Sequence, residues 1–176
     1  MEFIFAVSII FLVMDPLGNI PLIVPMLSGF PVERARRIIV REHFFALALL
    51  VAFMFFGGGI MKLFGINPSA LNISGGIILF LIAIQMIFPI RKSMFGSEDG
   101  GEPLVVPIAT PLIAGPSAMI TVMLLPVQRG MGASLALLAV VCAWALSLVI
   151  LRNSFFLSRI LGKRGVEAVS RLMGML

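Results

Sequence analysis

The residues of this chain best suited to bind a small charged molecule lie in two short proline-bracketed segments. The first runs Asp15-Pro16-Leu17-Gly18-Asn19-Ile20-Pro21, and the second runs Thr110-Pro111-Leu112-Ile113-Ala114-Gly115-Pro116. In each, Pro-Leu opens the segment and a second proline follows five residues after the first. Proline lacks an N–H and clashes with the preceding helical turn, so we expect Pro16, Pro21 and Pro111 to break the helices that contain them.

Asp15 is the most distinctive of these residues, because it follows about a dozen apolar residues and would lie near the middle of a membrane. An ionised carboxylate there costs about 2.5–3.5 kcal/mol on insertion scales, so a functional role is the default hypothesis. Asp15 could attract a substrate amino group or a coupling cation. It could also cap the helix that starts at Pro16 by accepting hydrogen bonds from freed N–H groups. The two roles are compatible.

Gly18 and Asn19 tolerate unusual backbone conformations, and glycine also lets a ligand approach the backbone closely. The start of a helix carries about +0.5 of an elementary charge, which suits a carboxylate. Gly115, Pro116 and Ser117 would present a matching helix start in the second segment. We therefore expect the two helix starts to hold a substrate carboxylate. The alternative is that these residues only permit helices to cross closely.

Four further polar residues are candidates. Thr110 takes the position of Asp15 in the second segment, and Thr121 lies on the helix after it. Their hydroxyls could bind a cation or an amino group, or bond back to the carbonyl four residues earlier. Glu42 and His43 follow Arg41 at the start of the second apolar segment. Ion pairing among Arg37, Arg41 and Glu42 is the ordinary interpretation, and a gate or a proton-sensing role for His43 is the alternative.

The elements that must position these residues are membrane helices. The chain of 176 residues is 60% hydrophobic and 12% charged, about half the charged fraction of a soluble domain. Apolar runs of about 20 residues recur along the chain, and each of these runs is long enough to cross a hydrocarbon core of ~30 Å. We predict an all-α membrane protein whose first and fourth helices are broken at the midplane, with segments at about 3–29, 38–61, 70–90, 104–128, 132–151 and from 166 onward. The sixth segment is short, and we expect a natural chain to continue beyond it.

The basic residues predict the orientation. Of the 13 Lys and Arg residues, all but Lys62 and Arg129 lie in or beside the loops 30–37, 91–103 and 152–165. The positive-inside rule places these loops in the cytoplasm and both termini outside. The net charge of +5 therefore reflects topology and does not indicate nucleic-acid binding.

The two halves of the chain repeat each other. Pro16 and Pro111 differ by 95 positions, and the sequence Lys62-Leu63-Phe64-Gly65 parallels Arg159-Ile160-Leu161-Gly162 at an offset of 97. Three spans is an odd number, so the second half must enter the membrane inverted, as in many secondary transporters. We expect a first repeat at 1–90, a linker at 91–103 and an inverted repeat at 104–176.

The two proline segments, with Met14 before the first, and the run Ile73-Ser74-Gly75-Gly76-Ile77 resemble the MarC/SnatA family of bacterial and archaeal integral membrane proteins over essentially the whole chain. The resemblance implies six spans in the cytoplasmic (inner) membrane and transport of small neutral amino acids, glycine and alanine foremost. It places the site at the first break and at Gly115, Pro116 and Ser117. Ser117 is a mild departure, since glycine or threonine is also acceptable after this Gly-Pro in the family that the chain resembles. A residue larger than glycine there could narrow the pocket.

These observations favour a secondary transporter of glycine, alanine and serine with alternating access and no cofactor. H⁺ coupling, Na⁺ coupling and uncoupled exchange all remain open, as does a homo-oligomer. A channel or scaffold for another solute is the alternative, although isolated polar clusters do not form the continuous polar stripe of a channel. An enzyme is not expected, because Asp15 is the one intramembrane carboxylate and the single His43 has no partner motif for a metal or a nucleophile.

Overall fold

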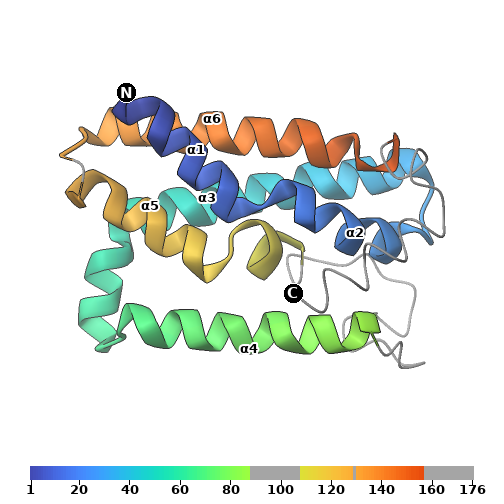
Figure 1. Ribbon diagram of the computed structural model, residues 1–176, viewed down its shortest axis with the longest axis horizontal. Helices are drawn as coiled ribbons and strands as arrows, with labels where there is room; N and C mark the ends of the chain where they lie inside the picture. The colour runs from blue at the N-terminus through green and yellow to red at the C-terminus, as the bar shows by residue number, and fades with distance from the viewer. Residues whose placement is uncertain (88–107, 129, 157–176) are drawn as a thin grey trace.

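The computed structural model describes residues 1–87, 108–128 and 130–156, and all regular structure in these ranges is helical (Figure 1). The predicted linker 91–103 and the predicted sixth segment lie outside the described residues. The elements are, in order, α1 (Glu2–Met14), α2 (Pro16–Leu27), α3 (Val32–Phe64), α4 (Pro68–Ile87), η1 (Ile108–Ile113), α5 (Pro116–Gln128) and α6 (Ala133–Arg152).

Three stretches of the described chain are long and apolar enough to cross a membrane: Glu2–Leu27, Val32–Phe64 and Ala133–Phe156. The first comprises α1 and α2 together. These stretches correspond to the first, second and fifth predicted segments. α5 provides a shorter apolar helix, Pro116–Pro126, in the region of the fourth.

α3 extends beyond the predicted segment 38–61 at both ends, so the expected loops at 30–37 and 62–69 are shorter than predicted. Pro31, with an extended backbone, precedes the helix, and Gly65 ends it in a left-handed conformation with φ 62°. The Arg, Glu and Lys residues of the two ends are good helix formers. The helix therefore continues past its apolar part, to a length of roughly 50 Å.

The helices pack around α3 and α6 (Figure 1). α6 contacts α1, α2, α3 and α5, while α3 contacts η1, α5 and α6. α4 lies along one edge and reaches α5 and η1. The core between these helices is apolar, and its largest fully buried side chains include Ile10, Met14, Ile23, Leu27, Ile39, Leu50, Ile108, Ile113 and Val122. η1 is therefore a short element enclosed by α2, α3 and α4.

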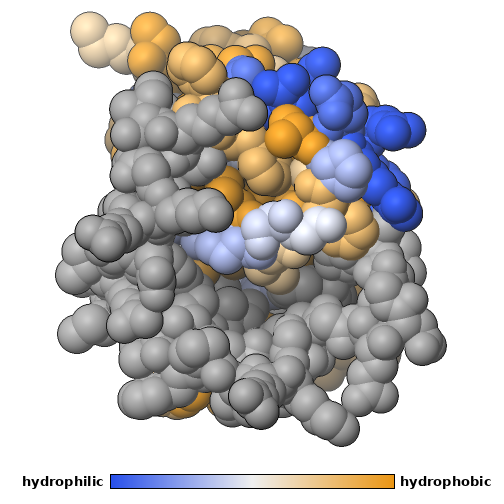
Figure 2. All heavy atoms as spheres, turned by 90° about the vertical axis from the view of Figure 1, so that its right-hand side faces the viewer, coloured by the Kyte–Doolittle hydropathy of each residue, from blue (hydrophilic) through white to orange (hydrophobic). Residues whose placement is uncertain are grey.

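Polar residues gather at the end of the molecule where α3 begins and α6 ends (Figure 2). These two helix ends expose the charged residues Glu33, Arg34, Arg37 and Arg152. Elsewhere, large apolar side chains are exposed on the outer faces of the helices, among them Phe44, Phe55, Phe56 and Phe80. This distribution suits helices surrounded by lipid, with charged residues at a membrane–water boundary.

Candidate functional site

The first break consists of a single residue. α1 ends at Met14, α2 begins at Pro16, and Asp15 between them has a left-handed backbone with φ 41° and ψ 60°. Its side-chain oxygen Oδ1 accepts a hydrogen bond from the backbone N–H of Gly18 at 3.0 Å. Pro16 is the first residue of α2, where its missing N–H costs nothing. Asp15 therefore caps α2, and its side chain is exposed in the structure.

The expected break at Pro21 is wrong. Pro21 lies inside α2, as does Pro25, and the helix continues through both to Leu27. A proline inside a helix removes one backbone hydrogen bond, and membrane helices tolerate this when neighbouring helices cover the freed carbonyl. Pro21 is buried, so here packing outweighs the loss of the bond.

The second break is longer. η1 is a π-type turn in which Thr110 has a non-helical backbone (φ −136°, ψ 127°) and Pro111 follows it. The backbone N–H of Ala114 donates to Ala109 O at 2.8 Å and closes the wide turn. α5 then begins at Pro116. A Cβ atom on Gly115 would lie 2.9 Å from the carbonyl oxygen of Pro111, so glycine is required by this close backbone approach.

The two breaks are in direct contact through Asn19. Its side-chain Nδ2 donates to Met14 O at 3.0 Å and to Leu112 O at 2.9 Å. Both partners are acceptors, so the amide nitrogen must face them. The side chain is 5% exposed. Asn19 was predicted as a ligand-binding residue, and the structure shows that its amide joins the end of α1 to η1.

The hydroxyl groups of the second break differ in their bonding. Thr121 Oγ1 donates to Ser117 O at 2.7 Å, which is the local bond expected as the alternative to ligand binding. Ser117 is exposed at the start of α5. Thr110 Oγ1 is buried and has no hydrogen-bond partner among the described residues. A buried hydroxyl without a partner is uncommon, and it leaves Thr110 able to bind a ligand or a water molecule.

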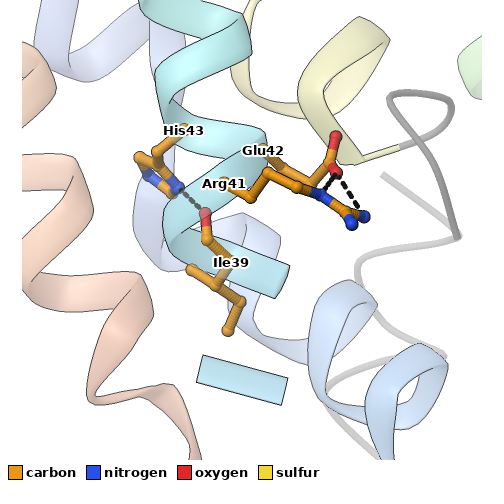
Figure 3. Close-up of polar contacts among 4 residues, drawn as sticks. All are labelled: Ile39, Arg41, Glu42 and His43. Carbon is orange, nitrogen blue, oxygen red and sulfur yellow. Dashed lines mark hydrogen bonds and ion pairs between the residues drawn. The ribbon is translucent and has the colours of Figure 1, made fainter. Parts of the chain in front are cut away.

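Glu42 and His43 point to opposite sides of α3 (Figure 3). Both are completely buried. Arg41 holds Glu42 Oε1 with two nitrogens, Nε at 3.0 Å and Nη2 at 2.9 Å. The predicted ion pairing is therefore present between Arg41 and Glu42. The carboxylate of Glu42 lies on the side of α3 that faces η1.

His43 instead joins α3 to α6. Its Nδ1 lies 3.0 Å from Ile39 O, so this nitrogen carries the proton and donates. Its Nε2 lies 3.3 Å from Ser147 Oγ, and Trp144 Nε1 donates to His43 O at 2.7 Å. Trp144 and Ser147 were missed by sequence reasoning, because a tryptophan and a serine in an apolar helix resemble ordinary packing residues. Figure 3 shows the His43–Ile39 bond.

Comparison with known proteins adds the family context. The family model described as "MarC family integral membrane protein" matches residues 1–176. The inner membrane protein YhgN of Escherichia coli (strain K12) is 42% identical over 176 residues, which cover 99% of this chain and 89% of that protein. A membrane protein of Buchnera aphidicola subsp. Schizaphis graminum is 38% identical over 175 residues, with the same coverage of both chains. One from Chlamydia trachomatis serovar D is 37% identical over 162 residues, covering 91% of this chain and 79% of the relative. No solved structure matches the chain.

Proposed function

Because the chain belongs to the MarC family of integral membrane proteins, we propose that it is a secondary transporter of small neutral amino acids such as glycine, alanine and serine. The bacterial inner membrane is its proposed location, in keeping with the E. coli relative. The observation that carries the proposal is the contact between the two broken segments, made by Asn19 and Leu112 O. Paired broken helices that meet inside a membrane protein are typical of transporter substrate sites.

The proposed site lies between the start of α2 and the second break. Backbone N–H groups at the starts of α2 and α5 would bind the substrate carboxylate, since helix starts favour anions. Gly18 and Gly115 leave no room for a Cβ atom, which keeps the backbone of both breaks tightly folded. The buried hydroxyl of Thr110 is available for a further hydrogen bond. Asp15 supplies a negative charge for a coupling cation, H⁺ or Na⁺.

The proposed architecture has six spans in two inverted repeats. The contact between α3 and α6 supports this arrangement. At the sequence offset of 97, Val140 corresponds to His43 and Ser147 to Leu50. An inverted repeat that brings His43 to Ser147 must also bring Leu50 towards Val140. Leu50 and Val140 are both 0% exposed, and a contact between them is what this symmetry predicts. Alternating access would then arise from one repeat rocking against the other.

The test is exchange in liposomes. Purified protein is reconstituted, and glycine-stimulated exchange of labelled alanine is measured for the wild type and for Asp15→Asn. Asparagine caps a helix about as well as aspartate, so this variant removes the charge and keeps the cap. We expect saturable exchange that Asp15→Asn reduces sharply at normal expression.

Two other results would change the interpretation. Full exchange in Asp15→Asn together with loss of folding in Asp15→Ala would make Asp15 a cap alone. A folded wild-type protein without exchange would reject amino-acid transport. Flux that does not saturate would indicate a channel, because a carrier with a binding site must saturate.

A further inference from the structure

Glu42 differs from every other carboxylate in the described part of the chain. Its side chain is 0% exposed, whereas Glu2, Asp15 and Glu33 are all exposed. A buried charge is strongly unfavourable unless an opposite charge and hydrogen bonds compensate it. Keeping the Glu42 carboxylate buried therefore reduces the stability of the fold. An apolar side chain would serve a purely structural role as well.

Arg41 supplies that compensation from one direction. Its Nε and Nη2 both bond to the same oxygen, Oε1, at 3.0 and 2.9 Å. The Arg41 side chain is 36% exposed, so the guanidinium reaches the carboxylate from the molecular surface. A guanidinium that is partly exposed can leave its partner more easily than a fully buried one, because it can turn towards the surface.

The location of Glu42 connects it to the broken segments. Its carboxylate points to the side of α3 that faces η1, away from His43 and α6 (Figure 3). η1 is in turn bonded to the first break through Asn19 and Leu112 O. Asp15 is less suited to hold a substrate amino group, because it is exposed and its Oδ1 is engaged by Gly18 N.

We infer that Glu42 binds the amino group of the transported amino acid, and that Arg41 is the resting counter-ion which this amino group displaces. The inference rests on the proposed function and adds which residue binds the amino group of the proposed substrate. An ammonium group offers three donors to a carboxylate, so one cation replaces another and Glu42 is never left buried without a positive partner. The substrate carboxylate remains at the helix starts, and the site selects a molecule that carries both charges.

Alanine and propionate provide the test, because they share a carbon skeleton and a carboxylate and differ in the amino group. Both are measured as inhibitors of labelled-alanine exchange and as ligands that raise Tm.

In Glu42→Gln we expect alanine to bind roughly 10–100-fold more weakly, the factor for a lost charge-assisted hydrogen bond, while the affinity for propionate changes little. In Arg41→Gln alanine should bind as well as in the wild type or more tightly, since it no longer has to displace the guanidinium. Glu33→Gln and Arg37→Gln, two separate changes of exposed charged residues on the same helix, are the controls and should leave both affinities unchanged.

Each outcome decides the question. Equal losses for alanine and propionate in Glu42→Gln, or no loss for either, would overturn the inference. So would weaker alanine binding in Arg41→Gln. If Glu42→Gln does not fold, Arg41→Gln decides alone: alanine must raise its Tm at least as much as it raises that of the wild type, and a smaller increase overturns the inference. A wild type that neither exchanges nor binds alanine rejects the proposed function instead, so the two failures are distinguishable.

Discussion

Replacing Asn19 tests the contact between the two breaks. Its amide donates to Met14 O and Leu112 O from a buried position, so Asn19→Ala removes both bonds and leaves two carbonyl groups without this donor. Asn19→Asp is the harsher change, because it brings a carboxylate oxygen towards two carbonyl oxygens. We therefore expect the wild type to be the most stable, Asn19→Ala to be less stable and Asn19→Asp to be the least stable.

The size of the effect follows from two estimates. Interhelical hydrogen bonds in membrane proteins average ~0.6 kcal/mol, which for two bonds gives a lower bound of about 1 kcal/mol. Leaving buried acceptors unsatisfied costs about 1–3 kcal/mol each, which raises the upper bound to about 4 kcal/mol when relaxation is partial. We expect Asn19→Ala to reduce the free energy of unfolding by about 1–4 kcal/mol.

The assay is unfolding in mixed micelles by titration with a denaturing detergent, followed by helical circular dichroism. Asn153→Ala is the matched control, because the Asn153 side chain also donates to one carbonyl, Val149 O at 2.8 Å, but is exposed and bonds within its own helix end. Its effect should stay within about 0.5 kcal/mol. If Asn19→Ala is as mild as this control, or if Asn19→Asp is as stable as the wild type, the bridge between the breaks does not contribute as described.

Two further changes test local geometry by the same titration. Gly18→Ala should cost about 1 kcal/mol, because its Cβ would overlap the Asp15 carboxylate and displace the cap, whereas Gly58→Ala, with nothing within 4 Å, should be neutral or stabilising. If Gly18→Ala loses no more stability than Gly58→Ala, the described cap at Asp15 is wrong. Trp144→Phe removes the indole donor to His43 O while keeping a ring in the core, and should cost about 1 kcal/mol. An unchanged stability would show that this bond does not hold α3 to α6.

The sequence predicted the elements better than their contacts. Apolar length and the Asp-Pro pair were enough to place the first long segment and its interruption, because these depend on local chemistry. Pro21 was misjudged, since whether a helix continues through a proline depends on the helices that cover it. The Asn19–Leu112 bond joins residues 93 positions apart, and no local pattern specifies such a partner.

The contacts of Glu42 and His43 in α3 also could not be predicted in full from the sequence. Ion pairing of Glu42 with Arg41 could be predicted from their adjacency. That Glu42 faces η1 while His43 faces α6 could not, because helical spacing sets only the angle between successive side chains. What each side chain meets is determined by the packing of the other helices around α3.

The adjacent positions of Glu42 and His43 on α3 couple the movements of their two side chains. Glu42 and His43 are neighbours on a rigid backbone, and their side chains reach different helices on opposite sides (Figure 3). A turn of α3 about its axis that draws Glu42 away from η1 must also shift His43 against Ser147 and Trp144. The contact with the second break and the contact with α6 therefore cannot be adjusted separately, and a movement at either one is transmitted through a single helical turn.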